Sequence, residues 1–387
     1  MRHAIVLSLT ALLAVSGVSS MQQRVTVGEA SAPYSQAVGA GGLVFVSALT
    51  GTDDEGGPAG DVEAATRGVL GHLRQVLDAA GSSLAQVLSV NVCLKRASDF
   101  DAMNTAYGAV FAADRPARTT VVADLEPGAL VQISAVAAPA GVPREVLHPA
   151  GWKKSPRPYS YIVRAGGFVF LSGLVSRRGS DDQVVPGPIA LQTKTILENA
   201  GVLLRTAGLS YADVVAARVF LTDDSYFEAM NEEYRKYFTS APPARATAIT
   251  GLMGNDAQVE ISLIATTGDK QSLGQSLWPT LPISSAIRAG GLTFLSGAMG
   301  NTVGNRDDVA AQARETFARI GKTLESAGLT FADVVDTTVF LPDASHRGKL
   351  DEVYREIFPS NPPTRSLIAA RLSTRDAAVE ILVTAAK

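Results

Sequence analysis

The apolar positions of this chain follow two spacings that predict helices and strands. Between residues 62 and 80, apolar side chains recur every three or four positions, which predicts a helix with one buried face, ended by Gly81. The apolar runs 43–47 and 87–94 have the length and the β-branched residues of strands. A capping box at residues 98–101 predicts the start of a second helix.

Two further strands close this unit in the order β-β-α-β-α-β-β, and the whole plan occurs three times. The clearest copy of its end is the stretch 241–265, where a proline turn leads to Arg245 in one strand and Glu260 lies in the next. Arg118 and Arg365 occupy the same position in the other copies, at spacings of 127 residues (245 − 118) and 120 residues (365 − 245). Because a unit of this size can bury a core of its own, we predict three similar domains of the α+β class.

The first twenty residues differ from the repeats. Arg2 and His3 precede an apolar run, from Ala4 to Val18, that is followed by small residues, which is the layout of a cleavable secretory signal peptide. The run is shorter than the roughly 18 to 20 apolar residues that a membrane-spanning helix needs. We expect a secreted or periplasmic protein without stable membrane insertion after cleavage.

The predicted boundaries follow from the repeats and the proline-rich segments between them. The predicted units are a signal peptide at 1–20 and repeats at 22–140, 150–267 and 275–387. The segments 139–158 and 266–282 are expected to be connectors.

Composition argues against several kinds of site. The single cysteine, Cys93, lies in an apolar run and is expected to be a small buried residue rather than a nucleophile. The four histidines are scattered without the spacing of metal ligands, so a metal site is not expected. The formal net charge is −3 and no stretch concentrates lysine and arginine, which argues against a nucleic-acid partner.

Five short motifs recur in the same order along the chain. They are P-Y-S-Q-A at 33–37, V-F-x-S at 44–47 and 169–172, M-N-x-x-Y at 103–107 and 230–234, P-A-R at 116–118 and 243–245, and V-E-I at 259–261 and 379–381. In this order and spacing they resemble the RidA family of reactive-intermediate (imine or enamine) deaminases, also called the YjgF or L-PSP endoribonuclease family. The resemblance implies a chorismate-mutase-like fold that normally assembles as a trimer. Three copies in one chain imply a monomeric protein that is a covalent pseudo-trimer.

The resemblance also assigns roles to residues at the repeated positions. The arginine after P-A is expected to hold a substrate carboxylate, because a planar guanidinium donates two parallel hydrogen bonds. The glutamate of V-E-I is expected to activate water against an imine carbon. Two repeats carry both residues, and we predict these to be catalytic: Arg245, Glu260, Arg365 and Glu380. The first repeat has Gln132 instead, and because an amide cannot accept a proton, general-base catalysis there should fall roughly 100- to 10,000-fold.

Further positions are expected to contact substrate. They are tyrosines, serines, one asparagine and the first arginine: Tyr34, Tyr159, Ser47, Ser172, Asn231 and Arg118. The third repeat departs from this pattern, with Ile283 at the tyrosine position and Asp351 at the asparagine position. No histidine lies at a spacing that could activate the serines, so they are not predicted to be nucleophiles.

The clefts of such a ring lie between neighbouring repeats, and the sequence leaves the sense of the ring open. We assume that tyrosine and serine come from one repeat, and that arginine and glutamate come together from the next. In one sense Tyr34 meets Arg245, and both main departures, Ile283 and Gln132, fall in one cleft. In the opposite sense only one cleft is intact. We hypothesise the first sense, with two working clefts and one degenerate cleft.

These expectations favour a hydrolase that needs no metal or organic cofactor and converts 2-imino or enamino acids into 2-oxo acids and ammonia. A different class is a periplasmic module that binds small carboxylates or amino-acid-derived metabolites without turnover, which needs no proton acceptor at Glu260 and Glu380. A structural or chaperone-like protein, in which the arginines are dispensable, stays open as well. Ribonuclease activity ranks last because of the acidic balance.

Overall fold

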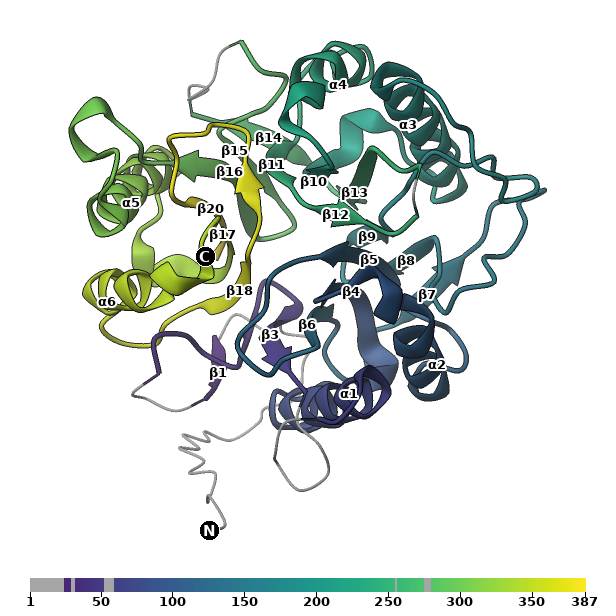
Figure 1. Ribbon diagram of the computed structural model, residues 1–387, viewed down its shortest axis with the longest axis horizontal. Helices are drawn as coiled ribbons and strands as arrows, with labels where there is room; N and C mark the ends of the chain where they lie inside the picture. The colour runs from purple at the N-terminus through teal and green to yellow at the C-terminus, as the bar shows by residue number, and fades with distance from the viewer. Residues whose placement is uncertain (1–23, 29–31, 52–58, 255, 275–279) are drawn as a thin grey trace.

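The computed structural model describes residues 24–28, 32–51, 59–254, 256–274 and 280–387. The predicted signal peptide at 1–20 lies outside these residues. Within them, three domains surround a common axis, with their sheets inside and their helices outside (Figure 1). None of the described helices is long and apolar enough to cross a membrane.

Each domain has the predicted order of seven elements, and the α+β class is confirmed. The first domain contains β2 (Ala37–Ala40), β3 (Leu43–Thr50), α1 (Val62–Ala79), β4 (Val87–Leu94), α2 (Phe100–Val110), β5 (Ala117–Val122) and β6 (Val131–Ala137). The second contains β8 (Ile162–Ala165), β9 (Phe168–Leu171), α3 (Ile189–Thr206), β10 (Val214–Leu221), α4 (Phe227–Tyr234), β11 (Ala244–Ile249) and β13 (Val259–Thr266). The third contains β15 (Ala286–Ala289), β16 (Leu292–Met299), α5 (Val309–Ser326), β17 (Val334–Phe340), α6 (Arg347–Ile357), β18 (Thr364–Ile368) and β20 (Glu380–Ala386).

Additional short elements complete the sheets and turns. The short strands are β1 (Val25–Val27), β7 (Arg144–Leu147), β12 (Gly251–Leu252), β14 (Lys270–Leu273) and β19 (Arg371–Leu372). Short 3-10 helices occur at Leu84–Gln86, Ala97–Asp99, Tyr211–Asp213, Asp224–Tyr226, Val303–Asn305, Phe331–Asp333 and Ala344–His346.

The helix ends confirm one local prediction and correct another. Gly81 follows α1 with φ of 73°, and the N–H of Ser82 reaches back to the carbonyl of Leu77, as in a Schellman motif. The capping box expected before α2 is absent. The residue before that helix, Asp99, forms no side-chain cap and pairs with Arg96 instead, since the 3-10 turn before α2 already uses these residues.

The segments expected to be connectors contain strands. β7 and β14 pair antiparallel with β8 and β15, and so form the outer edges of the second and third sheets. Their sequences, R-E-V-L and K-Q-S-L, contain no apolar run, so hydrophobic spacing carries no strand signal there.

The three sheets also share strands across the domain boundaries. β12 of the second domain pairs with β5 of the first, and β19 of the third pairs with β11 of the second. A bridge between Asp124 and Ala369 makes the corresponding link between the first and third domains. Each link covers a sheet edge that would otherwise expose unpaired N–H and C=O groups, and the ring is closed.

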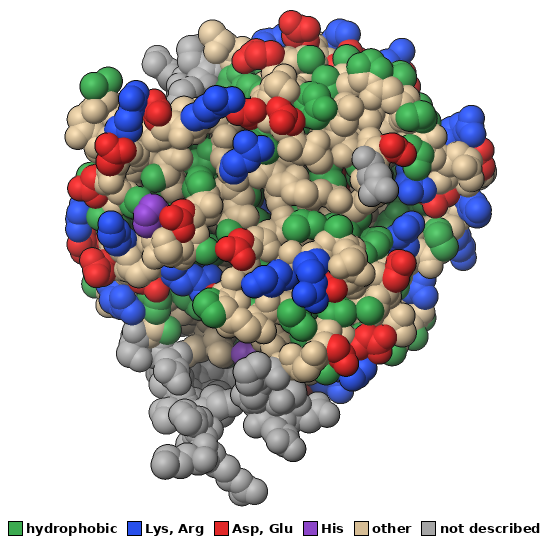
Figure 2. Space-filling view, in the orientation of Figure 1, with side chains coloured by type: hydrophobic (Ala, Val, Ile, Leu, Met, Phe, Trp, Pro, Cys, Tyr) green, Lys and Arg blue, Asp and Glu red, His purple; other side chains and the backbone are tan. Residues whose placement is uncertain are grey.

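The centre of the ring is packed by apolar side chains from all three domains. One shared cluster contains Phe45, Phe168 and Phe294, and another contains Phe220, Phe340 and Cys93. Cys93 is buried, as predicted, and burial raises the pKa of its thiol to about 12. On the face of the ring shown in Figure 2, basic and acidic side chains are interspersed, so this face has no extended basic surface.

Candidate functional site

Arg245 and Glu260 of the second domain cannot serve one small substrate. In the sheet order β11-β10-β13, strand β10 separates the strand that carries Arg245 from the strand that carries Glu260. Arg245 is paired with Ala217 and Glu260 with Phe220. Cross-strand partners share a face of the sheet, whereas positions three apart along a strand lie on opposite faces. The two side chains are therefore on opposite faces and roughly 14 Å apart, at two strand spacings and three residues.

Each arginine instead lies against the neighbouring domain, which supplies both the tyrosine position and the glutamate position. The backbone N–H groups of the three arginines donate to serines of that neighbour at 2.8 Å: Arg118 to Ser172, Arg245 to Ser296, and Arg365 to Ser47. The resulting clefts combine Arg118 with Tyr159 and Glu260, Arg245 with Ile283 and Glu380, and Arg365 with Tyr34 and Gln132. We name each cleft by its arginine.

This arrangement corrects the hypothesis about the ring. Ile283 belongs to the Arg245 cleft, because the adjacent Ser284 donates its N–H to the carbonyl of Pro243. The hypothesised sense, which placed Ile283 beside Arg118, is wrong. The assumption that arginine and glutamate come from one repeat is also wrong, because the two residues point to opposite faces of their sheet.

The three serines tie the domains together. Each Oγ accepts a hydrogen bond from the backbone N–H of an arginine. Each hydroxyl also donates to the backbone carbonyl of a serine in its own domain: Ser47 to Ser35 at 2.5 Å, Ser172 to Ser160 at 2.7 Å, and Ser296 to Ser284 at 2.6 Å. Each of these acceptor serines lies two residues after a proline. The proton of each hydroxyl is used in this contact. Contact of Ser47 and Ser172 with substrate stays a prediction, limited to the remaining lone pair of each oxygen.

The Arg118 cleft presents buried polar groups that no described residue satisfies. Arg118 is 4% exposed, and its guanidinium lies 4.9 Å from the ring centre of Tyr107 and 5.7 Å from that of Tyr159. Its Nη1 has no hydrogen-bond partner among the described residues. The same is true of both polar atoms of Asn104, which has on α2 the position that Asn231 has beside Arg245. Since an unsatisfied buried polar group costs about 1–3 kcal/mol, these groups favour a ligand with oxygen acceptors.

Glu260 enters the same cleft from the second domain. It is 5% exposed, and burial raises its pKa to about 8, although a backbone hydrogen bond from Thr120 and the charge of Arg118 act in the opposite direction. The carboxyl group occupies the space beside Gly173, where a Cβ atom would lie 1.9 Å from Oε1. Burial thus favours the protonated acid at neutral pH, and the carboxyl group fits there because position 173 has no side chain.

The Arg245 cleft has the arginine and the acid but a different wall. Arg245 Nη2 donates to Asn231 Oδ1 at 2.6 Å, while Nη1 has no partner among the described residues. Burial raises the pKa of Glu380 to about 8, although the charge of Arg245 acts to lower it. The carboxyl group of Glu380 lies beside Gly297, just as that of Glu260 lies beside Gly173. Ile283 replaces the tyrosine. Direct contact of Asn231 with substrate stays a prediction, because its described contacts hold the arginine and its own helix.

The Arg365 cleft is occupied by the protein itself. Asp351 lies 2.6 Å from the guanidinium of Arg365, and the ring of Tyr34 covers that guanidinium at 4.5 Å. Gln132 donates its amide N–H to a backbone carbonyl of the third domain at 2.8 Å. Ala48 stands where the other clefts have glycine. The cation is already paired and the acid is missing, so this is the degenerate cleft.

Sequence reasoning did not assign roles to Gly173, Gly297, Asn104 or Tyr107. A signal for the glycines was present, because glycine follows the strand-end serine in the two repeats that have glutamate and alanine follows it in the repeat that has Gln132. Among the described residues, no cluster of three or more His, Cys, Asp or Glu side chains could hold a metal ion.

Fold and site together define a single-chain pseudo-trimer of α+β domains with an arginine in each interface cleft. The chain belongs to the family described as Endoribonuclease L-PSP, which matches residues 24–139, 153–267 and 274–387. Similar proteins include protein DfrA of Myxococcus xanthus, 36% identical over 126 residues, which are 32% of this chain and 96% of that protein. A 2-iminobutanoate/2-iminopropanoate deaminase of Bos taurus is 34% identical over 125 residues, 32% of this chain and 91% of that protein. Each relative thus has about the length of one repeat, and the resemblance to the RidA family is confirmed.

A solved structure matches the ring as a whole. The crystal structure of a chorismatase aligns with a TM-score of 0.53, covering 78% of this chain and 93% of that chain at 14% sequence identity. At this identity the likeness concerns the fold alone.

Proposed function

We propose that the protein hydrolyses 2-imino acids to 2-oxo acids and ammonia, and that the Arg118 cleft is its principal active site. The observation that carries this proposal is the meeting, in one cleft, of a guanidinium with a free N–H and a buried carboxylic acid from another domain. The relatives of Bos taurus and Capra hircus that are named 2-iminobutanoate/2-iminopropanoate deaminase support the same reaction.

Arg118 holds the substrate carboxylate in this proposal. Its free Nη1 and the amide of Asn104 supply donors, and the ring of Tyr159 limits the space beside the guanidinium. Fixing the carboxylate places the neighbouring imine carbon and nitrogen toward Glu260. The ion pair between Arg118 and the substrate carboxylate is buried, and the exclusion of water strengthens it.

Glu260 moves the protons. As an acid with a pKa near 8, it gives its proton to the imine nitrogen, and the carboxylate that results accepts a proton from the water that adds to the carbon. The re-formed acid protonates the amine nitrogen of the carbinolamine. The C–N bond then breaks as the hydroxyl proton returns to Glu260, which releases ammonia and the 2-oxo acid and leaves the acid protonated.

The three clefts differ in their capacity for this reaction. The Arg245 cleft retains Glu380 and is a secondary site, slower because Arg245 is partly engaged by Asn231. The Arg365 cleft is inactive, because Asp351 occupies the cation and Gln132 cannot exchange a proton.

The test is turnover of imino acids that an amino-acid oxidase generates, followed by the loss of the semicarbazide adduct. Glu260→Gln should lower the rate of hydrolysis roughly 100-fold or more at the Arg118 cleft. The matched variant Glu380→Gln should keep most of the activity. Wild-type protein no faster than buffer, but able to bind 2-oxo acids in calorimetry, would replace the enzyme with a binding module.

A further inference from the structure

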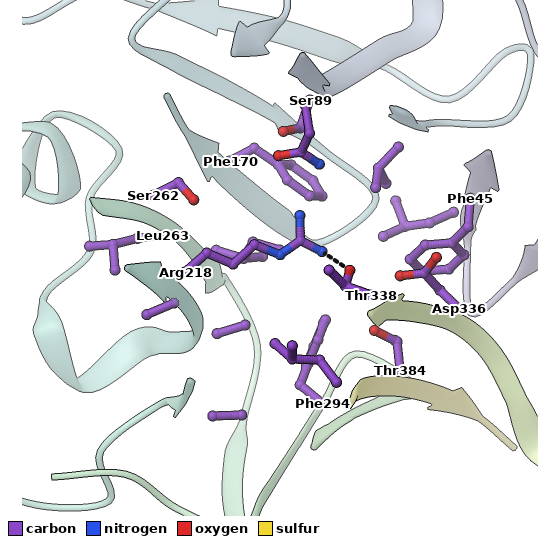
Figure 3. Close-up of a pocket in the computed structure, with 18 of the residues that line it drawn as sticks. Phe45, Ser89, Phe170, Arg218, Ser262, Leu263, Phe294, Asp336, Thr338 and Thr384 are labelled. Atoms are coloured by element: carbon purple, nitrogen blue, oxygen red, sulfur yellow. Dashed lines mark hydrogen bonds between the residues drawn. The ribbon is translucent and has the colours of Figure 1, made fainter. Parts of the chain in front are cut away.

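A second polar site lies on the axis of the ring, apart from the three clefts. A cavity of about 70 Å³, open on part of its surface, lies where β4, β10 and β17 come together (Figure 3). Its polar lining comes from all three domains: Ser89, Asn91, Arg218, Ser262, Asp336, Thr338 and Thr384. This volume is well above the roughly 10 to 15 Å³ that a single water molecule needs, so the cavity can hold a small ligand.

The charged residues of this cavity break the threefold repetition. The residues that pair in the sheets with the three cleft arginines occupy equivalent positions on β4, β10 and β17. The next residue along these strands is Asn91, Arg218 and Thr338, respectively. The residue before each partner is serine, alanine and Asp336. One domain thus contributes a single cation and another a single acid to a chamber that is otherwise neutral.

Neither charge is neutralised by the other in direct contact. Arg218 Nη2 donates to Thr338 Oγ1 at 2.8 Å, and no described carboxylate lies within ion-pair distance of the guanidinium. Figure 3 shows the guanidinium pointing into the cavity between Ser89 and Thr338, with the Asp336 carboxylate on the same side as Thr338. Asp336 accepts a hydrogen bond from Thr364 at 2.6 Å and another from the backbone of Thr337, and its carboxylate forms no ion pair with a described residue. Burial lowers the pKa of Arg218 and raises that of Asp336, while the attraction between the two charges acts in the opposite direction on each pKa.

We infer that the axial cavity binds a small α-amino acid as a zwitterion, with its carboxylate on Arg218 and its ammonium group toward Asp336. A guanidinium has five N–H donors, and only one is used by a described residue. A simple carboxylate would leave Asp336 unpaired and a simple amine would leave Arg218 unpaired, whereas a zwitterion satisfies both.

Size limits the side chain of this amino acid. Glycine, alanine and serine suit the cavity best, because its remaining walls include the bulky side chains of Phe45, Phe170 and Phe294. This site is independent of the hydrolysis proposed for the clefts, which uses neither Arg218 nor Asp336.

Isothermal titration calorimetry on the full chain tests this inference. L-alanine should bind with one site per chain, and Arg218→Met and Asp336→Asn should each weaken it at least tenfold. Acetate and methylammonium, which are half-ligands, should bind at least tenfold more weakly than alanine. Arg118→Met serves as the control for binding in a cleft and should leave the affinity for alanine unchanged.

Three outcomes would overturn the inference. Absence of alanine binding would mean that the cavity holds only water, and loss of binding in Arg118→Met would place the amino acid in a cleft. Acetate binding as tightly as alanine would define a plain anion site. If Arg218→Met does not fold, Ser89→Leu provides a second variant, because it fills the cavity without removing a charge and should abolish binding.

Discussion

Replacing Gly173 by alanine should disable the Arg118 cleft while leaving its arginine in place. The carboxyl group of Glu260 lies beside this glycine, and the added Cβ atom would be 1.9 Å from Oε1. Gly173 does not have a positive φ, so its backbone accepts alanine and the steric effect falls on the side chain of Glu260.

The size of the effect follows from this geometry. To reach an ordinary contact of 3.4 Å, the carboxyl oxygen has to move by about 1.5 Å (3.4 − 1.9). A misplacement of about 1 Å at a reacting group costs roughly 100-fold in rate, or about 3 kcal/mol. Because Arg118 keeps its contacts, kcat should fall much more than KM rises.

The assay is steady-state hydrolysis of oxidase-generated imino acids, with thermal unfolding measured in parallel. Gly297→Ala makes the same change beside Glu380 and should lower total activity by less than half. Ala48→Gly opens the corresponding space in the degenerate cleft and should change nothing, since Gln132 is there. Full activity of Gly173→Ala, or an equal loss in Gly297→Ala, would refute the placement of the principal active site.

Three other measurements address the acids, the degenerate cleft and the assembly. Glu260 has a pKa of about 8 when folded against an ordinary value of 4.5, so the stability it contributes is fully present below pH 4.5 and is lost as the pH rises to 8. Glu260→Gln should therefore raise the free energy of unfolding near pH 8 by up to about 5 kcal/mol, with little change at pH 4.5; an equal effect at both values in urea titrations would contradict this. Asp351→Asn should release Arg365 and add one 2-oxo acid binding site per chain in calorimetry, without added turnover, whereas an unchanged stoichiometry would mean that the cleft is closed by more than this ion pair. Light scattering should give the mass of one chain, because the ring closes within it, and a trimeric mass would contradict that closure.

The elements of the fold could be predicted closely because their signals are local. The strand expected at 87–94 has the bounds of β4, since it is a buried apolar run between polar turns. The repeat itself fixed the number of domains. The strands β7 and β14 could not be predicted in this way, because they are held by pairing with a neighbouring strand rather than by burial of an apolar face.

The way in which the predicted site residues combine could not be obtained from the sequence, and their roles stay a prediction. Arginine, tyrosine and glutamate positions were identified from motifs, but which of them meet depends on strand order and register. Because β10 lies between β11 and β13, Arg245 and Glu260 face away from each other, and Glu260 works with Arg118 of another domain. The need for Gly173 follows from the same contact and is invisible until two distant segments are brought together.

A double-mutant cycle tests the central claim, that Arg118 and Glu260 form one site although they come from different domains. We expect the kcat/KM of the Arg118→Met, Glu260→Gln double variant to be little lower than that of the worse single variant. Its loss in kcat/KM should therefore be at least tenfold smaller than the product of the two single losses. For Arg245→Met and Glu260→Gln, which change residues of one repeat, the double variant's loss in kcat/KM should equal the product of the two single losses. Multiplicative losses for Arg118 with Glu260, together with coupling between Arg245 and Glu260, would contradict the account.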